Sequence, residues 1–145
     1  MSTDELYMRE ALKEACKSID KDEVPVGAVI VANGKIIARA HNLTETLNDV
    51  TAHAEMQAIT AAASYLGGKY MRDCTLYVTL EPCQMCAGAL YWAQMARVVY
   101  GATDAKRGFS LCLPSPLHPA TILMKGVLEK ECADILIDFF KKKRK

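Results

Sequence analysis

Strand-like and helical segments alternate along the second half of the chain, and this alternation restricts the fold more than any other feature. Residues 74–80 and 98–100 are rich in β-branched and aromatic side chains, which favour strands. Pro82 is predicted to open a helix that runs between them to about Met95. A short strand at about 121–124 then precedes a final amphipathic helix. Strands separated by helices predict a layered α/β domain.

The first half adds a helix and a hairpin. Ser2 and Glu5 have the spacing of a capping box, and apolar residues follow them at intervals of three and four. An Asn-Gly dipeptide at 33–34 joins the apolar segments 26–31 and 35–38. That dipeptide tolerates two positive φ angles, so it predicts a hairpin of two antiparallel strands.

Two polar segments are predicted to be loops. The first, 42–51, ends at Thr51, which is expected to cap a helix from about Ala52 to Leu66. The second, 102–119, is interrupted by Gly and Pro and has room for one short helix. The complete order predicts a three-layer α/β/α domain, with the hairpin at one edge of a mixed sheet and helices on both faces.

The predicted helix at 84–95 contains no charged residue, although a helix outside a small domain normally has a polar stripe. Either part of it contacts another subunit, or the first and last helices cover it completely. The pattern does not separate these alternatives.

Length and composition limit the remaining possibilities. The 145 residues suffice for a single domain over 1–145 that is stable without a structural metal, so a metal is expected to serve chemistry. The longest apolar run, 26–32, is far shorter than the ~20 residues of a membrane span.

The acidic start is unlike a secretory signal, and six unevenly spaced cysteines fit a reducing compartment, so we expect a cytoplasmic protein. Five of the 18 basic residues form a basic tail at 141–145.

Metal-ligand chemistry is indicated by two short motifs. His53-Ala54-Glu55 begins one predicted helix, and Pro82-Cys83-Gln84-Met85-Cys86 begins another. Cysteines at i and i+3 on a first helical turn point the same way, and the positive helix end favours their thiolates. Two thiolates and one imidazole select zinc and leave one position open for water, as in a catalytic zinc site.

Glu55 lies two residues from His53 and can act as general base and then general acid. This indicates hydrolytic attack on an electrophilic carbon with a nitrogen leaving group. The pairing of H-x-E with P-C-x-x-C is the signature of the zinc nucleobase deaminases.

Other interpretations stay open at this point. The Cys pair could be a redox pair, although such pairs do not need an upstream H-x-E. Cys74, Cys112 or His118 could complete a closed structural zinc site in a non-enzymatic binding module. His41 is expected to be a surface residue at a strand end.

Much of the chain resembles the bacterial tRNA-specific adenosine deaminases. The resemblance runs nearly end to end and is carried by residues 23–28, 41–42, 51–55, 75–89, 101–106 and 138–140. It implies a cytidine deaminase-like fold with a five-stranded sheet and a homodimer with one zinc per subunit. The implied reaction converts the wobble adenosine of a tRNA anticodon stem-loop to inosine.

The resemblance also implies residue roles. Zinc would be held by His53, Cys83 and Cys86, and Glu55 would be the catalytic proton carrier. Substrate would be bound by Asn42, the Ala54 backbone, Val26, Asp104, Phe139 and Phe140. The last two, with the basic tail, would form an edge that stacks bases and binds phosphates.

Parts of the sequence depart from that family. Thr103 replaces an expected arginine, and the segment 107–118 is shorter than usual. Residues 89–92 are also similar to guanine deaminases, which act on a free base. A guanine or cytosine-type free-base or nucleotide deaminase is therefore the competing prediction.

Overall fold

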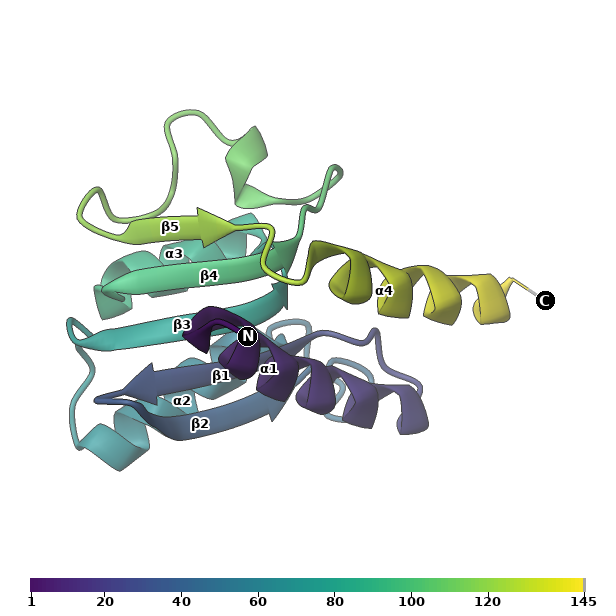
Figure 1. Cartoon of the computed structure of the whole chain (residues 1–145), viewed down its shortest axis with the longest axis horizontal. Helices are drawn as coiled ribbons and strands as arrows, with labels where there is room; N and C mark the ends of the chain where they lie inside the picture. Colours follow the sequence, from purple (N-terminus) through teal and green to yellow (C-terminus); the bar gives the residue numbers. More distant parts are fainter. Residues whose placement is uncertain (145) are drawn as a thin grey trace.

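A single five-stranded mixed sheet organises the protein. The computed structural model describes residues 1–144. Its strands follow the order β2-β1-β3-β4-β5, with β1 antiparallel to both neighbours and β3, β4 and β5 mutually parallel (Figure 1). The elements are α1 (Thr3–Asp20), β1 (Gly27–Ala32), β2 (Lys35–His41), α2 (Ala54–Leu66), β3 (Cys74–Leu80), α3 (Gln84–Ala93), β4 (Arg97–Ala102), the 3-10 helix η1 (Phe109–Leu111), β5 (Ile122–Lys125) and α4 (Glu129–Lys143).

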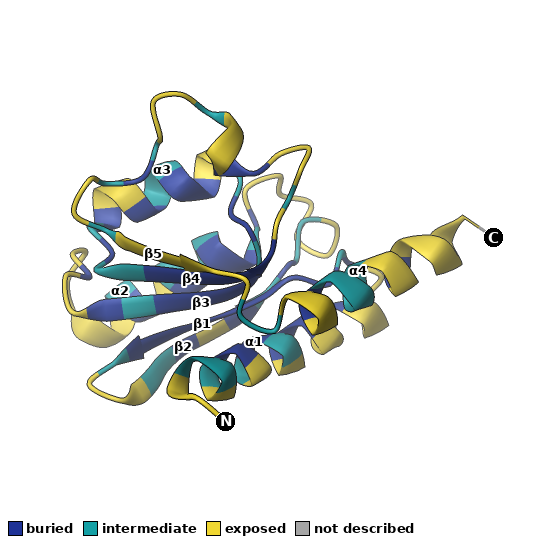
Figure 2. Cartoon of the chain, turned by 45° about the horizontal axis from the view of Figure 1, so that its top comes forward, coloured by how far each residue is buried: buried dark blue, intermediate teal, exposed yellow. Residues whose placement is uncertain are grey.

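Helices cover both faces of the sheet, which confirms the predicted three-layer α/β/α architecture. Successive residues of β1 point to opposite layers because side chains alternate along a strand. Ala28 and Ile30 pack in the cluster that contains α2 and α3, whereas Val29 and Val31 pack with α1 and α4. The inner strands β1, β3 and β4 are therefore buried on both sides, whereas all four residues of the edge strand β5 are exposed (Figure 2).

The N-terminal half forms the capping box and the hairpin that its sequence predicts. The Ser2 hydroxyl accepts from the Glu5 backbone N–H, and the Glu5 side chain accepts from the Ser2 N–H, so the capping box is formed. Asn33 and Gly34 have φ angles of 52° and 71°, as the predicted hairpin requires. Gly27 lies so close to α1 that a Cβ there would overlap the Ala11 carbonyl oxygen.

Two helices begin later than their sequences predict. α2 starts at Ala54 with His53 as its N-cap, and Thr51 donates instead to the Asp49 carboxylate at 2.7 Å. α3 starts at Gln84 with Cys83 as its N-cap. Neither cap residue makes a side-chain cap hydrogen bond. Both side chains face the functional site instead.

α3 is not covered by α1 and α4, because these two helices lie on the opposite face of the sheet (Figure 1). Its inner side, including Cys86 and Leu90, is buried. Its outer side exposes Met85, Tyr91 and Trp92, the last at 76%. Of the two alternatives for this helix, complete cover by the first and last helices is therefore excluded for the single chain.

The predicted basic tail is part of α4 rather than a separate segment. Lys141, Lys142 and Lys143 form its last turn, Arg144 is its C-cap, and Lys145 lies outside the described residues. α4 continues beyond the ends of the strands toward the C-terminus (Figure 1). Within residues 1–144, no helix has the length and apolar character needed to cross a membrane.

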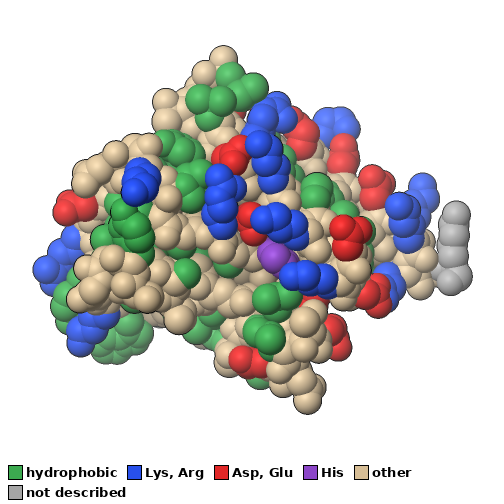
Figure 3. Space-filling model, turned by 90° about the horizontal axis from the view of Figure 1, so that it is seen from below, with side chains coloured by type: hydrophobic (Ala, Val, Ile, Leu, Met, Phe, Trp, Pro, Cys, Tyr) green, Lys and Arg blue, Asp and Glu red, His purple; other side chains and the backbone are tan. Residues whose placement is uncertain are grey.

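Charges of both signs are interspersed on the face seen in Figure 3. Ion pairs formed by α1 include Lys13 with Glu10 at 2.7 Å and Arg39 of β2 with Glu10 at 2.8 Å. A deeper pair joins Asp4 to Arg97 of β4 at 2.6 Å. The pairs of Glu10 with Arg39 and of Asp4 with Arg97 attach α1 to the sheet, whereas the Lys13 pair lies within the helix.

Candidate active site

Two helix N-termini bring the three predicted metal ligands together. The Nδ1 atom of His53 lies 3.6 Å from Cys83 Sγ and 3.5 Å from Cys86 Sγ. The three donor atoms lie within 4.8 Å of one another, and the described residues contain no other such group of His, Cys, Asp or Glu donors. Cys74, Cys112 and His118 are therefore outside the cluster, which does not form the closed four-ligand site considered above.

The electrostatics of the cluster favour a bound cation. A hydrogen bond with Cys86, followed by contact with His53, lowers the pKa of Cys83 to about 4. The same contact with Cys83, together with burial, raises the pKa of Cys86. Cys83 is thus held as a thiolate, the form that binds soft metal ions.

Zinc fits this donor set. Tetrahedral coordination with zinc bonds of about 2.3 Å to sulfur and about 2.0 Å to nitrogen places S and N ligands about 3.6 Å apart. The two observed sulfur–nitrogen distances, 3.6 and 3.5 Å, match this geometry. His53, Cys83 and Cys86 would hold the ion.

Glu55 lies beside the cluster in the first turn of α2. It is 4% exposed, and burial raises its pKa to about 7. A carboxyl group with a pKa near neutrality can both accept and donate a proton at working pH. The position and protonation of Glu55 therefore suit acid–base catalysis.

A cavity of about 950 Å³ opens over these residues. It brings together most of the predicted site: its lining includes Val26, Asn42, His53, Glu55, Cys83, Asp104 and Phe140. Basic side chains from the loop after β4 and from the end of α4 also line it, namely Lys106, Arg107, Lys143 and Arg144. Thr103, which departs from the expected arginine, lies on the same wall.

Three of the predicted substrate-binding residues differ in their burial and in their access to the cavity. Ala54 is fully buried, but it is the first residue of α2, where a backbone N–H has no partner within the helix. Phe140 is 45% exposed, whereas Phe139 is 9% exposed and does not line the cavity. Phe139 instead lines a second, smaller pocket with Ile19 and Lys142, and its contact with substrate stays a prediction.

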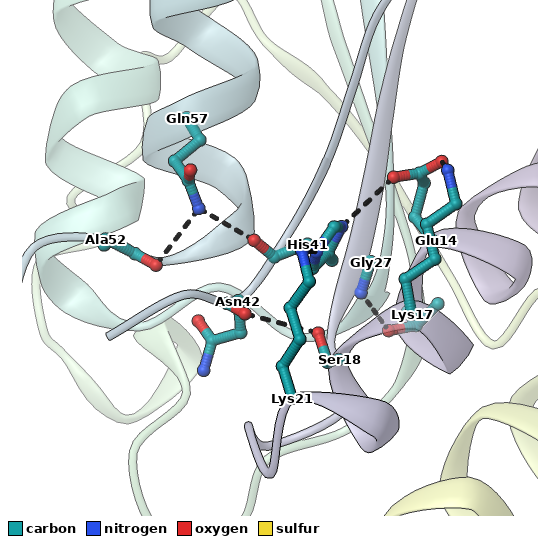
Figure 4. Close-up of polar contacts among 10 residues, drawn as sticks. Glu14, Lys17, Ser18, Lys21, Gly27, His41, Asn42, Ala52 and Gln57 are labelled. Carbon is teal, nitrogen blue, oxygen red and sulfur yellow. Dashed lines mark hydrogen bonds and ion pairs between the residues drawn. The ribbon is translucent and has the colours of Figure 1, made fainter. Parts of the chain in front are cut away.

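Asn42 is fixed by a hydrogen-bond network (Figure 4) that the sequence did not predict. Its backbone N–H donates to Val26 O at 3.1 Å, and its carbonyl accepts from the Ser18 hydroxyl at 3.3 Å. Gln57 Nε2 donates to the preceding carbonyl, that of His41, at 2.7 Å. α1 and α2 therefore hold Asn42 from two sides.

The His41 ring belongs to the same network. His41 ends β2 as expected, but its side chain is 12% exposed rather than on the surface. Its Nδ1 lies 3.3 Å from Glu14 Oε1 and its Nε2 lies 2.9 Å from Lys21 Nζ. The ring therefore lies between Glu14 of α1 and Lys21, the C-cap of that helix.

Known proteins share this sequence pattern and fold. Residues 1–102 match the family described as the cytidine and deoxycytidylate deaminase zinc-binding region. The tRNA-specific adenosine deaminase of Bacillus subtilis is 52% identical over 100% of this chain and 93% of its own length. The protein of the same name from Aquifex aeolicus is 44% identical over 97% of this chain and 95% of its own length.

Solved structures give a similar result. A structure from studies of A-to-I editing by tRNA:A34 deaminases at the wobble position of transfer RNA has a TM-score of 0.85 and 44% identity. That match covers 90% of this chain and 99% of the other. The guanine deaminase of Bacillus subtilis matches with a TM-score of 0.66 and 44% identity over 71% of this chain and 66% of the other.

Proposed function

This chain belongs to the cytidine and deoxycytidylate deaminase family, and within it to the tRNA-specific adenosine deaminases, and from that membership we infer that it deaminates the wobble adenosine of a tRNA anticodon to inosine. One observation carries this function. A single cavity joins the zinc-ligand cluster and Glu55 to four basic side chains. Basic groups around the catalytic residues suit a polyanionic substrate better than a free base.

We propose that zinc, one per subunit, is held by His53, Cys83 and Cys86. When bound, zinc would lower the pKa of a water molecule and so supply a nucleophile at neutral pH. Glu55 would accept a proton from the attacking water and return it to the departing amino group. Water adds at the amino-bearing carbon of adenine and ammonia leaves, so that inosine is the product.

We propose that the remaining cavity residues hold a nucleotide that has left its base stack. Asn42 and the Ala54 N–H would hydrogen-bond the flipped nucleotide, and Val26 would contact the base. Asp104 and Phe140 would contact neighbouring anticodon nucleotides, and the basic side chains would contact phosphates.

We also propose a homodimer, which the exposed apolar side of α3 supports: Met85, Tyr91 and Trp92 are 37%, 38% and 76% exposed. We propose that residues 1–145 form one domain. We propose a reducing compartment such as the cytoplasm, which is supported by the six cysteines, none of them in a disulfide.

Multiple-turnover deamination tests the function. Zinc-loaded protein is given an adenosine-containing anticodon stem-loop and, separately, free guanine, adenosine and cytidine. Glu55→Gln with its zinc retained is the blank. Inosine formed in the RNA supports the proposal. Xanthine from guanine with unchanged RNA would instead support the alternative favoured by the guanine deaminase match.

A further inference from the structure

A buried carboxylate that takes no part in the proposed chemistry holds one wall of the cavity. Glu81 lies between β3 and the metal-binding corner at Pro82 and Cys83, and it is 2% exposed. Its Oε1 accepts from the Asp104 backbone N–H at 3.1 Å, and its Oε2 accepts from the Ser110 backbone N–H at 2.9 Å. Both oxygens of one side chain therefore hold the two ends of the segment 104–110.

The backbone of this segment is fitted closely around Glu81. A Cβ at Gly108 would overlap the Glu81 carboxyl group, although the φ angle of Gly108, −65°, is accessible to any residue. Next to it, the Phe109 N–H donates to Pro82 O at 2.9 Å. The glycine is required by the position of the carboxylate rather than by its own backbone conformation.

The segment held in this way carries the basic side chains of the cavity wall. Asp104 Oδ1 accepts from the backbone N–H groups of Lys106 and Arg107 at 3.1 and 3.0 Å. Both basic residues line the cavity beyond that turn. A carboxylate–amide hydrogen bond is stronger than a neutral one, and loss of a buried acceptor leaves its donors unsatisfied. Glu81 thus fixes the position of two cations at the entrance of the site.

We propose that Glu81 is a positioning residue that sets RNA affinity by holding the 104–110 loop, independently of the chemistry at Glu55. This inference rests on the proposed function, because it takes the RNA backbone as the ligand of the loop. A displaced loop removes phosphate contacts that act in both the ground state and the transition state. Such a loss raises KM and leaves kcat nearly unchanged.

The test uses Glu81→Gln, whose amide must point a donor toward one of the two backbone N–H groups. Gly108→Ala disturbs the contact between the loop and the Glu81 carboxyl group from the loop side. It tests the proposal if Glu81→Gln does not fold. Asp4→Asn is the matched control, because it also removes a carboxylate with two partners but lies outside the cavity lining. Zinc content, kcat and KM for the anticodon stem-loop are measured over a salt series.

Glu81→Gln and Gly108→Ala are expected to raise KM about tenfold, to change kcat less than about threefold and to retain zinc. The decrease in log(kcat/KM) with log[salt] should become shallower by the equivalent of about one or two phosphate contacts. Asp4→Asn should leave KM and the salt slope unchanged. Loss of zinc, a fall in kcat at constant KM, or an unaltered salt slope would overturn the proposal. Failure of the parent protein to deaminate the stem-loop would refute the proposed function instead.

Discussion

Asp4 gives the sharpest stability prediction. Its carboxylate receives two hydrogen bonds from Arg97, at 2.8 and 2.6 Å, and one from the Tyr77 hydroxyl at 2.7 Å. The Asp4 and Arg97 side chains are 22% and 25% exposed. These exposed fractions place the pair between two classes of ion pair. Surface pairs are worth about 0–1 kcal/mol, and disruption of a buried pair costs about 3–5 kcal/mol. We expect Asp4→Asn to lower the free energy of unfolding by about 2 kcal/mol at pH 7.

The pH dependence of this effect follows from the direction of the pKa shift. The hydrogen bonds from Arg97 lower the pKa of Asp4 below its ordinary value of 3.8. A group with a lowered folded-state pKa stabilises fully above its unfolded pKa and loses that contribution as pH falls through the folded value. The stability difference between parent and Asp4→Asn should therefore be constant from pH 7 to pH 5 and shrink below pH 3.8.

Urea denaturation of the metal-free proteins, followed by far-UV circular dichroism, measures this difference. The thermal midpoint of Asp4→Asn should fall by about 4–8 °C at pH 7. A ΔΔG below about 0.5 kcal/mol at pH 7 would show that the contact acts as an exposed pair. A difference that stays the same below the ordinary carboxyl pKa would refute the ionic origin.

Three other predictions test the metal site, the helix–sheet contact and the aromatic edge. Cys86→Ala leaves two protein donors, so its zinc content by mass spectrometry should fall below about a tenth of the parent value, and full retention would contradict the ligand assignment. Gly27→Ala places a methyl group against the Ala11 carbonyl and should destabilise by about 3 kcal/mol in urea titration, unless α1 can move away freely. Phe139→Ala should cost about 3 kcal/mol of stability with little change in KM, whereas Phe140→Ala should raise the stem-loop KM about tenfold with little loss of stability. The reverse pattern would contradict the placement of the two rings.

Local signals in the sequence predicted the order of the elements. The Asn33-Gly34 turn and the Ser2 capping box each act within a few residues, so their outcome is readable without tertiary structure. The start of α2 was misplaced because His53 occupies the N-cap position for its role at the cluster, not for its capping ability. Sequence rules for helix starts look for a side chain that hydrogen-bonds to the first turn of the helix, and His53 makes no such bond.

Motif spacing predicted the group of His53, Cys83 and Cys86, because two helix starts determine where those side chains point. Glu81 escaped prediction because its partners lie 23 and 29 residues away and are backbone groups, which have no sequence signature. The resemblance gives Phe139 and Phe140 the same role, but only Phe140 lines the cavity. Adjacent residues on a helix point about 100° apart, so the two rings lie in different surroundings.

The last turns of α4 contribute Phe140, Lys143 and Arg144 to the cavity, and the helix extends beyond the ends of the strands (Figure 1). These three residues are exposed, so replacing them removes little buried surface and costs little folding free energy. The ligand cluster and Glu55, by contrast, are built into the helix starts against the sheet. Substitutions at the end of α4 can therefore change one side of the cavity without disturbing the residues proposed to carry the reaction.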